Sequence, residues 1–174
     1  LFMWRRVREP SRLPPERLAG AVVSGVRYIA YSLPIRIVLI RTMATGVFGG
    51  SILALMPIVA RDLLAGNARD FGIMLGAFGV GAVIGALNVS ELSSRLGAER
   101  AIRVCVIAMG AGVAVVAVSH SKIVSGLALL LAGAGWTASV TMFNVGIQLV
   151  APRWVSGRAL AAFQASISGG VAVG

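Results

Sequence analysis

Charged side chains are scarce in this sequence, and acidic ones are the scarcest. Only 13% of the 174 residues are charged, and 6 of them are Asp or Glu against 16 Lys or Arg. A soluble globular domain carries about 25% charged residues. A chain with half that share cannot cover a surface that faces water, so the composition excludes an ordinary soluble domain and favours a protein that lies in a bilayer.

Residues that commonly form catalytic or metal sites are equally few. The chain has one cysteine, Cys105, and one histidine, His120. Cys105 lies in an apolar run without a partner for a disulfide or a metal site, so we interpret it as a small buried hydrophobic residue. His120 lies in a short turn with no carboxylate nearby in sequence, which is typical of a solvated residue. We therefore expect no enzymatic activity, no metal and no cofactor.

Apolar residues make up 57% of the chain and form runs of about 20 residues between short charged clusters. A run of that length spans a bilayer as a helix. The fold class that we predict is an all-α membrane protein with four complete spans and a fifth that is cut off. Because the chain starts at Leu1 and stops inside an apolar run, we expect it to be a piece of a longer protein. The predicted spans cover about residues 37 or 42 to 60, 71–90, 102–119, 123–150 and 159–174.

Residues 1–36 are basic and contain four prolines, so we predict a linker there and a partial helical bundle over residues 37–174. Within the linker, the stretch from Pro15 to Tyr31 predicts a short amphipathic helix on the membrane surface, with Arg17 and Arg27 facing water. Arg41, near the start of the first span, allows two interpretations. It extends to the headgroups, which we favour, or it faces a watery cavity within the bundle.

The distribution of the basic residues predicts the orientation. Thirteen of the 16 Lys and Arg residues lie before the first span or in the loops after the second and fourth spans. The positive-inside rule then places the linker and the loops near residues 91–103 and 151–158 in the cytoplasm. The net charge of +10 does not indicate nucleic-acid binding, because the arginines lie between apolar runs and not on one water-exposed face.

Two kinds of residue stand out inside the predicted spans. Small residues at a spacing of four predict close helix packing in the second span, where they are Gly72, Gly76, Gly81 and Gly85. Asn144 and Gln148, also four apart, share a face of the fourth span, with Trp136 about two turns earlier. This polar face either lines a substrate path or forms hydrogen bonds between helices, and the sequence favours neither.

The chain resembles the second half of a major facilitator superfamily transporter, and most closely the bacterial secretion-effector branch that includes siderophore exporters. The stretches that carry the resemblance are "ERLAGAVVSGVRYIAYSLPIRIVLIR" and "APRWVSGRALAAFQASISGG". It implies that the spans correspond to helices 7–11 of a twelve-helix transporter, with the N-terminal half missing here. It also implies export of a small organic molecule across the bacterial cytoplasmic membrane by alternating access.

The superfamily's signature loop resembles "SSRLGAER", where Arg95, Gly97 and Arg100 fit the pattern and Ser94 replaces the acid. Arginines at a helix end can bond carbonyls and carboxylates of a neighbouring helix and so hold an inner gate shut. Gly157 and Arg158 can serve likewise. The alternative is that these arginines only set the topology. A non-transporting membrane protein, such as a sensor or an assembly scaffold, is the competing functional hypothesis.

Overall fold

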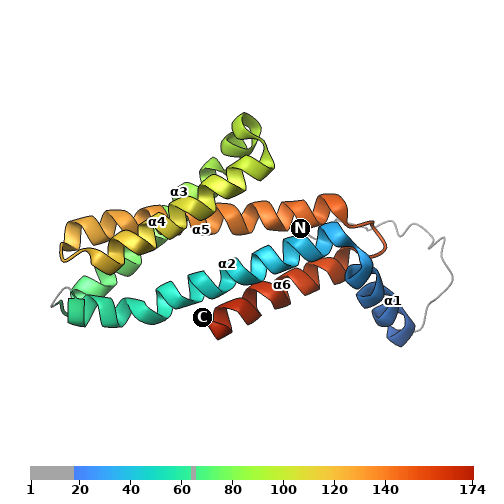
Figure 1. The fold of residues 1–174 in the computed structure, drawn as a ribbon, viewed down its shortest axis with the longest axis horizontal. Coiled ribbons are helices and arrows are strands. Elements are labelled where there is room, and N and C mark those ends of the chain that lie inside the picture. Colours follow the sequence, from blue (N-terminus) through green and yellow to red (C-terminus); the bar gives the residue numbers. More distant parts are fainter. Residues whose placement is uncertain (1–17, 64–65) are drawn as a thin grey trace, which may run out of the picture.

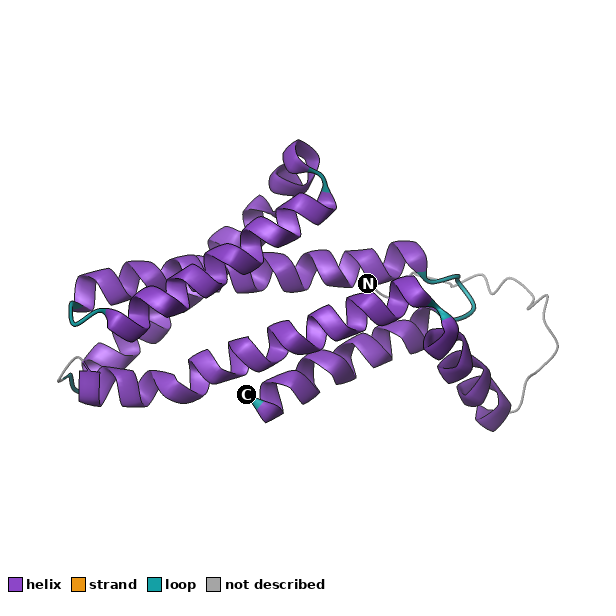
Figure 2. Ribbon diagram, viewed as in Figure 1, coloured by secondary structure: helices purple, strands orange, loops and turns teal. Residues whose placement is uncertain are grey.

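The computed structural model describes residues 18–63 and 66–174, and every regular element in these two ranges is a helix (Figures 1 and 2). Residues 1–17, which include almost half of the predicted linker and the first residues of its predicted helix, lie outside the described part. The helices are α1 (Leu18–Tyr31), α2 (Leu33–Ile58), the π-helix η1 (Val59–Leu63), α3 (Ala68–Leu96), α4 (Ala98–Val118), α5 (Lys122–Val150) and α6 (Ser156–Val173).

Four of these helices are long and apolar enough to cross a membrane. They cover Leu33–Asp62, Ala68–Leu96, Ala98–Val118 and Lys122–Val150, and the shortest has 21 residues. A bilayer core about 30 Å thick requires about 20 residues of helix. The predicted all-α membrane fold with four complete spans is therefore confirmed, and α6 begins near the start of the predicted fifth span.

Most of these helices extend past the predicted spans. α3 begins three residues before residue 71 and continues past residue 90 to Leu96. Its last turns are polar but remain helical, and there Glu91 pairs with Arg95 one turn later. Hydropathy detects only the part of a helix that lies in hydrocarbon, so it underestimates helices whose polar ends reach into the headgroups.

The end of α2 departs from regular α-helix. Pro57 lies inside α2, and the chain continues directly into the π-helix η1 over Val59–Leu63. Proline has no N–H to donate, and its ring clashes with the carbonyl four residues earlier. Hydropathy carries no signal for this change of helix type, and the sequence did not predict it.

α5 lies at the centre of the group formed by α3, α4 and α5 (Figure 1). It packs along its length against α3 on one side and α4 on another, and the α4–α5 pair forms the antiparallel hairpin that the short turn at His120 predicts. α2 pairs with α6 and makes a smaller contact with α5. α2 and α6 approach closely because Gly46 lies directly against Gly170. A Cβ added to Gly46 would lie 3.1 Å from the Cα of Gly170.

We call the end of the molecule that carries the α1–α2, α3–α4 and α5–α6 connections the arginine-rich end. At this end α1 packs against α2 and α6. Tyr28 and Ile29 pack onto a buried cluster that includes Val155 and Ala159. Val22, Val23 and Val26 of α1 remain exposed, as a helix on the membrane surface requires.

The opposite, arginine-poor end is held by a polar network. Asn67 caps α3 by accepting hydrogen bonds from the N–H groups of Arg69 and Asp70, and the Asp70 carboxylate accepts one from the Asn67 N–H in return. The same carboxylate pairs with Lys122 at 2.7 Å. The first turn of α3 is thereby joined to the first turn of α5.

Candidate functional site

The predicted polar face lies on α5 near its arginine-rich end. The Gln148 side-chain amide donates a hydrogen bond of 2.6 Å to the Asn144 side-chain oxygen. Asn144 is half-buried and Gln148 is exposed. Thr137 and Thr141 extend the same face toward the middle of α5, because residues three, four and seven apart in a helix lie on one side. The result is a stripe of hydroxyl and amide groups along one face of a mostly apolar helix.

Trp136 lies apart from this stripe. Its ring packs onto α2 beside Gly49, where an added Cβ would collide with the six-membered ring. It also contacts the apolar cluster formed by α2, α3, α4 and α5. Trp136 therefore occupies the crossing of α2 and α5, and its side chain faces away from Asn144, about two turns later on the same helix.

The four glycines predicted for helix packing have different surroundings. Gly81 and Gly85 are buried against the backbone of α5, where a Cβ would collide with Leu130 and Ala134, respectively. Gly72 and Gly76 have open space, with no described heavy atom within 4 Å of an added Cβ. All four lie on α3, so the difference comes from where α5 crosses α3.

The first predicted gate segment forms the connection between α3 and α4. α3 ends at Leu96 and α4 begins at Ala98, so Gly97 alone joins them, with a φ of +77° that favours glycine. Arg95 pairs with Glu91 of its own helix. Arg100 is exposed and makes no ion pair with any residue that the structure describes.

The second predicted gate segment begins α6 and contacts α1 instead of the first segment. The Arg158 side chain passes over Gly25 of α1, and one of its terminal nitrogens, Nη1, is buried without a hydrogen-bond partner in the described ranges. Gly157 has open space around it. Figure 1 draws the α3–α4 connection well away from the α5–α6 connection, so the structure does not bring the two segments together.

One polar contact between helices was not predicted from the sequence. Arg41 of α2 forms an ion pair of 2.9 Å with Glu99 of α4, and Glu99 also pairs with Arg103 at 3.2 Å. Arg41 lines a cavity of about 360 Å³ between α2, α4 and α5. Arg41 therefore lines a cavity while 45% of its side chain stays exposed, so both interpretations of Arg41 remain predictions. The only sequence signal was one acidic residue, Glu99, just before the predicted third span.

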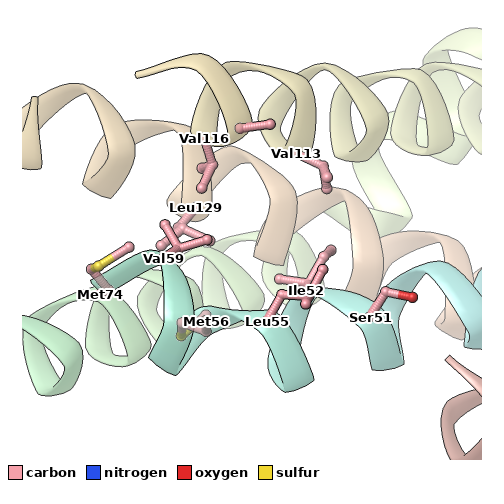
Figure 3. A pocket seen from close by; sticks show the side chains of 10 residues that line it. Ser51, Ile52, Leu55, Met56, Val59, Met74, Val113, Val116 and Leu129 are labelled. Atoms are coloured by element: carbon pink, nitrogen blue, oxygen red, sulfur yellow. The ribbon is translucent and has the colours of Figure 1, made fainter. Parts of the chain in front are cut away.

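A second cavity lies further along the same groove, toward the arginine-poor end. It has a volume of about 110 Å³ and apolar walls, with Ser51 as the one residue with a polar side chain among those that line it (Figure 3). Among residues 18–63 and 66–174, no group of three or more His, Cys, Asp or Glu side chains lies close enough to hold a metal ion.

Comparison with known proteins supplies the functional context for this geometry. A family model described as transmembrane secretion effector matches residues 1–174. Comparisons with curated proteins and with solved structures gave no match.

Proposed function

Because the chain belongs to the transmembrane secretion effector family of major facilitator transporters, which is not an enzyme family, we propose that it is part of an exporter of a small organic molecule. The chain is a multi-pass membrane protein. In this proposal the protein lies in the bacterial cytoplasmic membrane, and the chain supplies helices 7–11 of a twelve-helix transporter whose N-terminal half precedes it. The cycle is alternating access, in which two helical bundles rock about a central site.

The observation that carries this proposal is the stripe on α5. A side-chain amide costs several kcal/mol in hydrocarbon unless it is hydrogen-bonded or meets water. Gln148 and Asn144 satisfy one hydrogen bond between them and keep their remaining donors and acceptors accessible. Accessible amides on the central helix of the bundle are suited to contact a polar substrate, because each can both donate and accept.

Thiol labelling of the full-length protein tests this proposal. In a Cys105→Ala background, we expect Asn144→Cys and Gln148→Cys to react with a membrane-impermeant, charged thiol reagent, and the rate to change when a transported compound is added. Leu149→Cys is the matched control. It follows Gln148 directly, about 100° from Gln148 and about 140° from Asn144 around the helix, and its exposed side chain is apolar. We expect Leu149→Cys to stay unlabelled.

Two results would count against transport along this face. Protection of positions 144 and 148 in every condition would favour a closed bundle, as in a sensor or an assembly scaffold. A labelling rate that stays the same with every compound that cells carrying the intact gene export would indicate that the substrate path lies elsewhere. In either case Asn144→Leu should leave export unchanged, whereas the proposal expects export to fall at least tenfold, because a polar substrate would lose its hydrogen bonds.

The gate is a separate part of the proposal. Arg95, Gly97 and Arg100 at the tip of the α3–α4 connection, with Gly157 and Arg158 at the start of α6, form the cytoplasmic closure. Arg100 supports this role because its guanidinium makes no ion pair within the described chain and is available to a carboxylate or carbonyl of the N-terminal half.

A further inference from the structure

The groove between α2 and α4 is charged at one end only. At the arginine-rich end Arg41 and Arg103 flank Glu99, and all three side chains line the larger cavity. Their exposed fractions are 45%, 70% and 49%, respectively, so both guanidinium groups are accessible from outside the protein. Two arginines and one glutamate leave a net charge of +1 at the mouth of the groove.

The rest of the groove is apolar apart from the hydroxyl-bearing residues Thr45 and Ser51. The walls of the larger cavity continue from the arginines to Phe48 of α2, Met109 of α4 and Phe143 of α5. One turn further along the two outer helices, Ile52 and Val113 begin the smaller cavity (Figure 3). The groove therefore combines a cationic mouth with a long apolar floor.

We propose that this groove binds an anionic phospholipid of the membrane. The phosphate would lie between Arg41 and Arg103, and an acyl chain would lie along α2 and α4 over Phe48 and Ile52. Charge complementarity supports this occupant, because basic pockets between transmembrane helices bind anionic headgroups at the membrane surface. The proposal does not depend on what the protein transports.

The groove faces a different direction from the predicted substrate path. Phe143 forms part of its floor, whereas the next residue, Asn144, belongs to the polar stripe about 100° around α5. The residues at its rim are large, apolar and exposed, including Phe48 at 63% and Ile107 at 70%. Where no other transmembrane helix covers this rim, it meets lipid, and an amphiphile of the membrane then reaches the groove without passing through water.

Glu99 acts as an internal competitor for the lipid phosphate. Its carboxylate already accepts hydrogen bonds from Nη1 of Arg41 and from Nε and Nη2 of Arg103. Each guanidinium has five N–H donors, so both retain donors for a second anion. Removal of the Glu99 charge should therefore strengthen lipid binding, whereas a Glu99 that only held α2 and α4 together would give the opposite result.

The test measures lipid selectivity of the full-length protein in phosphatidylcholine vesicles by electron paramagnetic resonance. The probes are spin-labelled phosphatidylglycerol and spin-labelled phosphatidylcholine, and the readout is the ratio of their association constants. We expect the wild-type protein to prefer phosphatidylglycerol. The ratio should fall about fivefold or more in Arg41→Gln/Arg103→Gln, and rise up to about fivefold in Glu99→Gln, because each charge near the surface is worth about 1 kcal/mol.

Arg95→Gln is the matched control, because it removes an arginine at the same end that pairs only within α3. A ratio of one in the wild-type protein would overturn the proposal, and this is the result expected if another transmembrane helix of the full-length protein fills the groove. An equal loss in Arg95→Gln would also overturn it, because the preference would then reflect surface charge in general. A fall of the ratio in Glu99→Gln would show that Glu99 and the two arginines only hold α2 and α4 together.

Discussion

At Gly81 and Gly85 the absence of a side chain determines how closely two helices pack. Both lie where the backbone of α5 passes directly over α3, and neither has room for a Cβ. In lipid, helices associate mainly through close packing, since the acyl chains are as apolar as the side chains they replace. The two glycines therefore set the distance between α3 and α5.

We expect Gly85→Ala to destabilise the protein by about 1–3 kcal/mol, because the added methyl would force α3 and α5 apart. Thermal unfolding in detergent, followed by tryptophan fluorescence, measures this as a fall of several degrees in Tm. Gly76→Ala is the control, since its Cβ would meet open space and alanine favours helix. Equal Tm values for the two variants would contradict the predicted contact.

At the scale of the elements, the contact between α1 and α6 attaches the linker to the bundle. The rings of Tyr28 and of Trp154, which lies in the connection just before α6, meet edge to face with centroids 5.3 Å apart. Nearby, Gly25 leaves the space that the Arg158 side chain fills. α1 is therefore fixed to the start of the predicted gate segment and not only joined to α2 through Ser32.

We expect Gly25→Leu to release α1, because the leucine side chain would occupy the place of the Arg158 stem. Tyr28→Ala should weaken the same contact by about 0.5–1.5 kcal/mol beyond the lost area, the usual worth of an aromatic pair. Hydrogen exchange of the amides in α1 should become faster in both variants. Val22→Ala, on the exposed side of α1, should leave the exchange rates unchanged. Unaltered exchange in Gly25→Leu would show that α1 is held elsewhere.

The sequence predicted the helices well because each span is long enough to be set by hydropathy alone. It could not predict which residues meet across the bundle. Arg41 and Glu99 are 58 residues apart and Lys122 and Asp70 are 52 apart, and no local pattern links such partners. The glycines make the same point, since Gly72 with Gly76 and Gly81 with Gly85 have identical spacing but only the second pair meets a neighbour.

The candidate site was predicted only in part for a similar reason. The spacing of Asn144 and Gln148 was enough to predict a shared face, because a helical repeat is a local property. Trp136 is close to them in sequence, yet its ring is directed to Gly49 by the crossing of α2 and α5. The distance between the two gate segments likewise depends on helix tilt, which hydropathy does not determine.

At the scale of the whole molecule, the asymmetry of basic residues predicts which end faces the cytoplasm. Ser94, beside the α3–α4 connection, and Ser121, in the α4–α5 turn, are both exposed and lie at opposite ends. In a Cys105→Ala background, an impermeant thiol reagent added to intact cells should label Ser121→Cys and spare Ser94→Cys. Permeabilised cells should label both. Labelling of position 94 alone in intact cells would indicate the opposite orientation.

The network of Asn67, Asp70 and Lys122 holds one end of α3 in place. It fastens the start of α3 to the start of α5, while the other end of α3 carries Arg95 and is followed by Gly97. With 29 residues, α3 is about 44 Å long, so a tilt of about 5° about its fastened end would move its other end by about 4 Å. Because Gly97 alone joins α3 to α4, a displacement of this end of α3 would also move the start of α4 at the arginine-rich end.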